Sequence, residues 1–152
     1  MDLGELLAQE ERLQFAAFDL DTAFALGSAV VDLARRRGLA VTVDVRHGDQ
    51  QAFHAALPGT APDNDAWIER KVRVVRRFGR SSLRLGRELA EAGRTIEEQF
   101  GLPEAEFAAH GGAFPVIVRG TGPVGVVTVS GLPQADDHAL VVEVLEAFLV
   151  DA

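Results

Sequence analysis

Two strand–turn–strand patterns constrain the fold of this chain most strongly. In the first, β-branched residues alternate through Ala40–Arg46, a turn follows at His47–Asp49, and Gln50–Leu57 returns as a second strand. In the second, FPVIVR at 114–119 and VGVVTVS at 124–130 flank the turn sequence GTGP. Each pattern predicts a β-hairpin, and hairpins make a sheet largely antiparallel.

Helical patterns separate and flank the two hairpins. They cover, in chain order, residues 3–13, 22–37, 66–79, 81–92 and 95–100, and a last helix that begins at Pro133. Asp21 is the expected cap of the second helix, and Asp63 or Asn64 that of the third. A further candidate strand, RLQFAAFD, occupies residues 12–19. The prediction is an α+β fold with a mostly antiparallel sheet of about five strands flanked by helices.

Composition narrows the class of protein. The 152 residues are 47% hydrophobic, which suits one globular domain over residues 1–152. No apolar run approaches the roughly 20 residues that span a bilayer, and the first residues, MDLGELLAQEERL, carry acids where a secretory signal carries basic residues. We therefore expect a cytoplasmic protein without a membrane partner. The chain has no cysteine, which excludes disulfides, thiolate metal sites and a cysteine nucleophile.

Charge is distributed unevenly. The net charge of −8 argues against nucleic-acid binding, yet eight basic residues and one acidic residue lie between Glu69 and Arg87. Arginines in this segment step by three and four, at Arg70, Arg73, Arg77, Arg80, Arg84 and Arg87. They form one face only if the helix continues past Gly79. Arginine suits interfacial pairing with carboxylates, so Arg73, Arg77 and Arg80 are candidate oligomer contacts; the alternative is a solvated face.

The stretch SGLPQADDH at 130–138 ends in two aspartates and a histidine. If a helix opens at Pro133, the acids meet the positive end of its dipole, which is worth roughly 0.3–1 kcal/mol each. Successive helical residues point about 100° apart, so Asp137 and His138 do not easily bind one metal without a partner such as His110. We favour helix capping, predict no metal site, and note that a helix start is a natural anion site.

A third candidate group combines an aromatic ring with two cations. Trp67 has Arg70 three residues later and Lys71 four residues later, so both cations can lie near the indole and hold a carboxylate or phosphate. In the alternative interpretation, Trp67 belongs to the core or to a subunit contact and the cations are solvated.

The triplet His110-Gly111-Gly112 is the fourth candidate group. Two glycines after a histidine allow a ligand to approach main-chain N–H groups closely. Alternatively, the glycines only make a tight connection into the strand that starts at Phe114.

Several of these motifs together resemble a known family. They are NDAWIERK at 64–71, HGGAFP at 110–115, VSGLP at 129–133 and the pair Asp137-His138. They are similar to an uncharacterised bacterial and fungal family within the haem-degrading domain superfamily, which also includes extracellular haem-binding sensor proteins and a protein of glycolate-utilisation operons. The resemblance spans roughly residues 6–149.

The resemblance implies a profilin-like fold and a ring-like homo-oligomer built from dimers. It also makes haem a possible cofactor, on the resemblance alone. A haem ligand would be His47, His54, His110 or His138, and no Cys-x-x-Cys-His motif singles one out. The fungal relatives are associated with chaperone-linked protein delivery, which is a different class of role.

Three functional hypotheses follow. The leading one is a homo-oligomeric protein that binds a small anionic ligand between the Trp67-Arg70-Lys71 helix, the His110-Gly111-Gly112 loop and the helix start at Asp137-His138. The second is an interaction protein whose motifs serve ring assembly. The third is a haem-binding or haem-degrading protein, or an enzyme that uses His110 or His138 as acid and base; whether the chain is an enzyme stays open.

Overall fold

A four-stranded antiparallel sheet in the order β2-β1-β4-β3 forms the centre of the computed structural model, which describes residues 1–150. The strands are β1 Thr42–His47, β2 Gln50–Ala56, β3 Ala113–Val118 and β4 Gly122–Ser130. The helices are α1 Leu3–Arg12, α2 Leu20–Arg36, α3 Pro62–Phe78, α4 Ser82–Ala92, α5 Ile96–Phe100 and α6 Gln134–Leu149. Both predicted hairpins are confirmed, and β1 joins them by pairing with β4.

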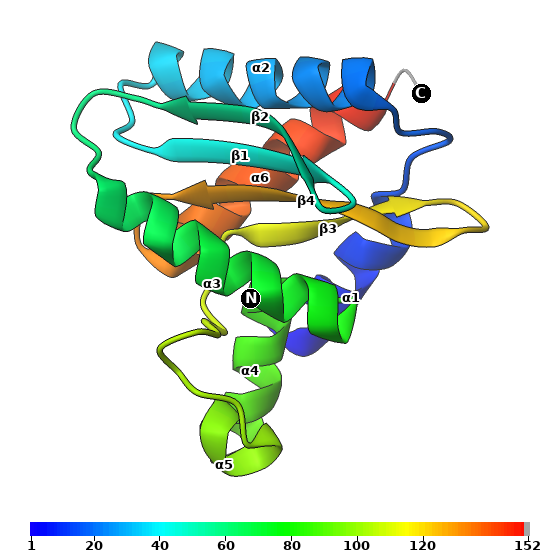
Figure 1. The fold of residues 1–152 in the computed structure, drawn as a ribbon. Helices are drawn as coiled ribbons and strands as arrows, with labels where there is room; N and C mark the ends of the chain where they lie inside the picture. Colours follow the sequence, from blue (N-terminus) through cyan, green and yellow to red (C-terminus); the bar gives the residue numbers. More distant parts are fainter. Residues whose placement is uncertain (151–152) are drawn as a thin grey trace.

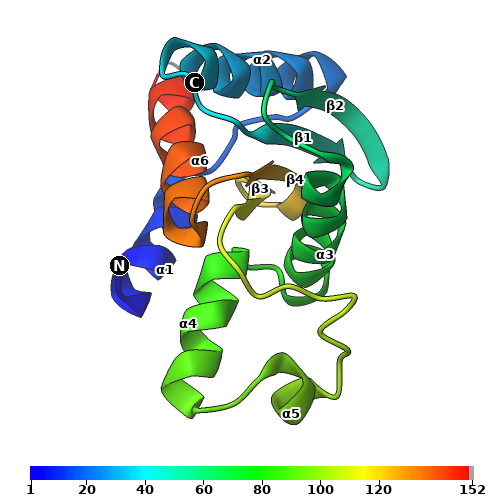
Figure 2. The ribbon, with the colours of Figure 1, turned by 90° about the vertical axis from the view of Figure 1, so that its left-hand side faces the viewer.

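The sheet is covered on both faces. Helices α2 and α6 lie on one face and α3 lies on the other (Figures 1 and 2). The alternation in β1 explains this arrangement, because successive side chains of a strand point to opposite faces. Val43 and Val45 join the large apolar cluster under α2 and α6, whereas Asp44 and Arg46 are buried polar residues. Within residues 1–150, no helix is long and apolar enough to cross a membrane.

Helices α4 and α5 form a smaller layer beyond the β3 edge (Figure 1). Its apolar cluster joins Val74 of α3 to Leu85, Leu89 and Ile96. Helix α1 packs against α4, and there the Glu10 carboxylate accepts hydrogen bonds from the main-chain N–H of residue 81 (3.2 Å) and from the guanidinium of residue 84 (2.8 Å).

The predicted first strand at 12–19 is wrong, and the sheet accordingly has four strands. Phe15 makes a single parallel bridge to Val118 at the β3 edge, in which its N–H donates to the carbonyl of Ile117 at 2.7 Å. The neighbouring residues turn their apolar side chains into the core instead of extending a ladder, and Asp19 already caps α2.

Helix boundaries follow the local capping chemistry, with two corrections. Asp19 caps α2 in place of the predicted Asp21, accepting a hydrogen bond from the N–H of Thr22 at 2.8 Å. Helix α3 begins at Pro62, earlier than predicted, because proline needs no N–H partner at the first helical position. Gly79 ends α3 in the left-handed conformation, with φ 66°. The helix therefore breaks where the arginine steps would have to continue.

Candidate functional site

A cavity of about 290 Å³ lies where the starts of α3 and α6 meet the end of β4. Its walls include Trp67 and Lys71 of α3, His110 of the loop before β3, Ser130 of β4, and Gln134 and Asp137 of α6. Four of the predicted ligand-binding residues thus line one cavity. Its volume is at the small end of the range for ligand pockets, which limits a ligand to a few heavy atoms.

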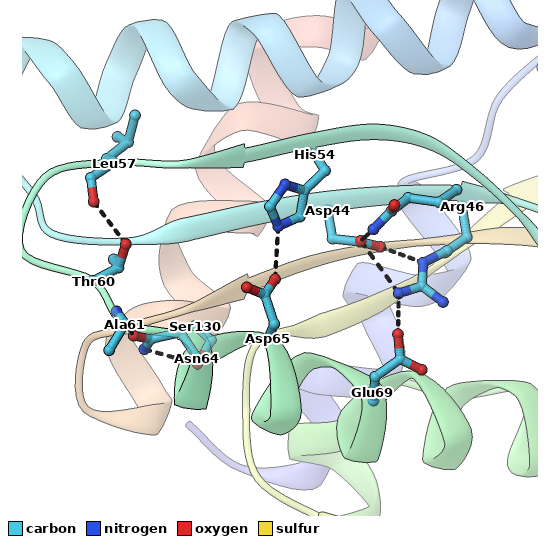
Figure 3. A network of polar contacts seen from close by, with 11 residues as sticks. Asp44, Arg46, His54, Leu57, Thr60, Ala61, Asn64, Asp65, Glu69 and Ser130 are labelled. Atoms are coloured by element: carbon cyan, nitrogen blue, oxygen red, sulfur yellow. Dashed lines mark hydrogen bonds and ion pairs between the residues drawn. The ribbon is translucent and has the colours of Figure 1, made fainter.

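The first half of α3 is fixed to the β1–β2 hairpin by charged side chains. Figure 3 shows His54 of β2 reaching Asp65, with 2.6 Å between His54 Nε2 and Asp65 Oδ1. Arg46 of β1 contacts Glu69 at 2.5 Å and Asp44 at 2.7 Å. These contacts set the position of the helix turn that carries Trp67 and Lys71.

Lys71 and Asp137 form a buried ion pair across the cavity wall. Their side chains are 4% and 2% exposed, and Lys71 Nζ lies 3.3 Å from Asp137 Oδ2. Lys71 Nζ also donates to the carbonyl of Val129 at 3.2 Å. Asp137 accepts hydrogen bonds from the N–H groups of Leu132 at 2.9 Å and Gly131 at 3.3 Å. The pair therefore ties α3 to the turn between β4 and α6.

This geometry adds to the expected role of Asp137. Both acids lie in the first turn of α6, as predicted, but Asp136 is exposed and Asp137 is buried. Asp137 instead bonds main-chain groups that precede the helix, and its partner Lys71 comes from a helix 66 residues away.

Burial shifts both members of the pair towards their neutral forms. Loss of solvent raises the pKa of Asp137, an effect that Lys71 and the Leu132 N–H partly offset. Loss of solvent lowers the pKa of Lys71, an effect that Asp137 partly offsets. A proton can therefore pass from the ammonium to the carboxylate more readily than between exposed groups.

His110 and Arg70 both pack against the Trp67 ring system. The His110 ring meets Trp67 edge-on with centroids 5.3 Å apart, and the Arg70 guanidinium lies 4.4 Å from the Trp67 centroid. Burial of the His110 ring lowers its pKa, and the nearby cations Lys71 and Arg70 lower it further. The imidazole is therefore neutral at neutral pH. Arg70 donates to the carbonyl of Glu104 and lines a neighbouring cavity of about 390 Å³, not this one.

The glycines of the His110-Gly111-Gly112 loop serve close packing of the backbone. A Cβ at Gly111 would meet the carbonyl of Gln134 at 2.3 Å, and one at Gly112, where φ is 134°, would meet the carbonyl of Val129 at 2.3 Å. The Gly111 N–H already donates to Gln134 Oε1 at 3.0 Å. Both glycines are therefore explained by the alternative interpretation, a tight connection into β3. The loop places His110 at the cavity.

His138 lies outside the cavity, which separates it from the predicted constellation. Its side chain is 1% exposed, its Nε2 lies 2.8 Å from Gln9 Oε1 of α1, and its ring packs beside Phe114. Burial lowers the pKa of His138 to about 4, with a smaller contribution from the cation Arg87. Since His138 follows Asp137 directly on a helix, the two side chains diverge by about 100°.

The three candidate interface arginines have different surroundings. Arg80 forms an ion pair with Glu88 at 2.8 Å, and Arg73 donates to the carbonyl of Glu106 at 3.2 Å. Arg77 is exposed. The charge of Arg80 is therefore paired within the chain, whereas Arg73 and Arg77 are available for contacts at the surface.

Sequence reasoning missed the rest of the cavity wall and one signal about Lys71. Asn64, Ser130 and Gln134 lie within the motifs at 64–71 and 130–138 but were not selected as ligand-binding residues. Lys71, however, is the single lysine of a chain with fourteen arginines, a fact visible in the sequence. Over the described range 1–150, no group of three histidine or acidic side chains is arranged to hold a metal ion.

Comparison with known proteins assigns the family. Residues 18–146 match the family model described as Haem degrading protein HbpS-like. The chain belongs to the HbpS-like family. A UPF0303 protein of Streptomyces avermitilis is 58% identical over 147 residues, covering 97% of this chain and 90% of the relative. The crystal structure of Ybr137w protein is 33% identical with a TM-score of 0.92, covering 99% of this chain and 89% of that one.

The crystal structure of HbpS shares the fold of this HbpS-like chain. It is 24% identical with a TM-score of 0.68 and covers 90% of this chain and 92% of its own. Two of the motifs on which the resemblance rested, at 64–71 and 110–115, contribute Trp67, Lys71 and His110 to the cavity.

The family description names haem, whose iron needs an axial ligand such as histidine. Of the four histidines, His110 lines the cavity, His138 is buried against α1, and His47 and His54 belong to the first hairpin. A haem macrocycle needs a broad apolar slot. The cavity beside His110 has a volume of about 290 Å³, and Asp63, Lys71 and Asp137 are among its lining residues. This cavity is therefore not an enclosed haem site.

Proposed function

We propose that this HbpS-like protein binds a small anion, such as a carboxylate or a phosphate, in the cavity between α3 and α6. One observation carries the proposal: the start of α6, which has no side-chain cap, the start of α3 and the ammonium of Lys71 border the same cavity. The finding that the motifs of the family resemblance supply these walls supports it.

The start of α6 provides N–H donors. Pro133, the residue before this helix, makes no side-chain cap hydrogen bond, and the N–H groups of Asp136 and Asp137 donate to its carbonyl at 2.8 Å and 3.0 Å. The N–H groups of Gln134 and Ala135 are the first two of the helix, which have no partner within it, and Gln134 borders the cavity. The start of α3 contributes its dipole rather than donors, because Pro62 has no N–H and the Asn64 N–H donates to the Ala61 carbonyl at 2.9 Å. An anion between the two helix starts therefore meets donors from α6 and positive potential from both helices.

Lys71 provides the charge. An ammonium has three N–H donors, and Lys71 uses two of them, on Val129 and Asp137. The third is free to meet a ligand oxygen. The Trp67 and His110 rings close the side of the cavity next to it. The neutral His110 accepts or donates one hydrogen bond without repelling an anion.

Ligand binding should appear as an anion-dependent rise in melting temperature. We expect phosphate or a short carboxylate to stabilise the protein, and the double variant Lys71→Met/Asp137→Asn to lose at least about tenfold in affinity, since a hydrogen bond to a charged group contributes about 1.5–3 kcal/mol. Thermal shift and calorimetry measure both quantities.

The double variant removes both charges and keeps an oxygen acceptor at residue 137, and neutral replacement of a buried ion pair is often tolerated. Arg119→Met, which removes an exposed cation in the β3–β4 turn, is the matched control. Absence of stabilisation by every anion, or equal binding by the double variant and wild type, removes the proposal.

Haem binding is the second candidate, because the family description favours it. Adding haem to the same panel of ligands and recording absorbance spectra distinguishes haem binding from anion binding. A Soret shift that His110→Ala abolishes supports haem ligation at the cavity. A spectrum indifferent to all four histidines removes histidine ligation.

Self-association is a further proposal that the exposed arginines of α3 support. Arg73 and Arg77 lie at the surface of a helix in a chain with net charge −8, so an acidic surface of a second copy is a suitable partner. We expect Arg73→Glu/Arg77→Glu to reduce the assembly size in light scattering. Arg35→Glu, on the distant α2, is the control, and an unchanged size for the α3 variant counts against this interface.

A further inference from the structure

Lys71 is the one side-chain amine of the chain, and the fold places it in a cavity. Fourteen of the fifteen basic residues are arginines, which do not lose their proton in proteins. Lysine loses it when buried, and the resulting amine is a nucleophile. Lys71 is 3% exposed, and its side chain borders the proposed ligand cavity. The site thus contains the one side-chain amine of the chain.

The surroundings of Lys71 supply a route for its proton. Asp137 Oδ2 lies 3.3 Å from Nζ, and Asp137 is itself held by two main-chain N–H groups, so it stays in place when its charge changes. Burial lowers the pKa of Lys71 and raises that of Asp137, so transfer of the proton to the carboxylate costs less here than between exposed groups. Arg70, the preceding residue, donates to the carbonyl of Glu104.

We propose that Lys71 forms a Schiff base with a small carboxylate that also carries a ketone or aldehyde group, of the 2-oxo acid class. This inference rests on the anion-binding function proposed above. The carboxylate would occupy the helix starts of α3 and α6, and the carbonyl carbon would face Nζ. The volume of about 290 Å³ favours a ligand of few heavy atoms.

The step balances without an oxidant or reductant. Lys71 passes one proton to Asp137, and the Nζ lone pair forms a bond to the carbonyl carbon while the C–O π electrons move to oxygen. The nitrogen then gives one of its two protons to that oxygen, which forms the neutral carbinolamine. The carbinolamine then loses its hydroxyl group as water, using the proton held by Asp137. One ammonium and one carbonyl compound give one protonated imine and one water, and Asp137 returns to its carboxylate form.

Reductive trapping tests the proposal on the full chain. The protein is incubated with pyruvate and sodium cyanoborohydride, and intact mass and peptide mapping locate the product. The chain has two amines, Lys71 and the main-chain amine of Met1, so Met1, which is exposed, is an internal reference. We expect one carboxyethyl group at Lys71, formed faster than at Met1, and loss of that adduct in Lys71→Arg.

Propionate distinguishes the inference from the binding function, because it has the carboxylate without the carbonyl. We expect propionate to raise the melting temperature and to slow trapping of pyruvate at Lys71 while forming no adduct. If pyruvate and propionate both stabilise the protein but only Met1 is modified, or Lys71 reacts no faster than Met1, the Schiff base is wrong and anion binding stands. If neither stabilises the protein and Lys71 stays unmodified, both proposals are wrong.

Discussion

Replacing Asp137 with alanine is expected to lower the free energy of unfolding by about 3–5 kcal/mol, the usual effect of breaking a buried ion pair from one side. The substitution leaves the ammonium of Lys71 buried without its carboxylate. It also removes the acceptor of the Gly131 and Leu132 N–H groups, which fix the turn before α6. Urea unfolding followed by circular dichroism measures the change.

Asp136 is the matched control, because it is the neighbouring residue, has the same side chain and is exposed. Asp136→Ala loses only its interaction with the helix dipole, about 0.3–1 kcal/mol. If the two variants differ by less than about 1 kcal/mol, the Lys71–Asp137 pair is not the contact that holds α3 to α6.

The stability of the protein is expected to fall between pH 6.5 and pH 4 by about 3 kcal/mol through His138 alone. Burial lowers the pKa of His138 from 6.5 to about 4 in the folded state. Between these values the unfolded chain binds a proton that the folded chain does not. The contribution of neutral His138 is therefore complete above pH 6.5 and is lost as the pH falls through 4.

The variant His138→Gln isolates this contribution, because an amide does not titrate and still reaches Gln9. Free energies of unfolding are measured against pH for both proteins. We expect the wild-type curve to decline more steeply below pH 6.5, with the difference between the curves growing to about 3 kcal/mol near pH 4. Parallel curves would mean that folding does not lower the pKa of His138, which contradicts this prediction.

Local chemistry made most of the fold predictable. The hairpins follow from alternating β-branched residues, and the end of α3 follows from Gly79. The strand predicted at 12–19 does not form, because its apolar residues are equally suited to an irregular segment that fills the core. The single bridge at Phe15 depends on a tertiary contact with Val118, which the local sequence does not specify. No local pattern distinguishes the two outcomes.

The candidate site was predictable only as separate motifs. Trp67, Lys71, His110 and Asp137 were each selected, but the contact between Lys71 and Asp137 joins two helices at the end of β4. Arg70 and His138 were selected by the same motifs, but neither lines the cavity. Arg70 donates to the Glu104 carbonyl, and His138 contacts Gln9. Neighbours in sequence on a helix face different ways, so a motif cannot specify which of its members share a cavity.

The single lysine allows the most direct test of the central claim, that Lys71 belongs to an anion-binding cavity. Protein labelled with 15N in the lysine side chain gives one Nζ resonance, which reports on Lys71 alone. We expect the resonance to titrate below the ordinary lysine pKa, because the amine is buried, and to shift when propionate or phosphate is added. A resonance that titrates like exposed lysine and does not respond to either anion contradicts the account.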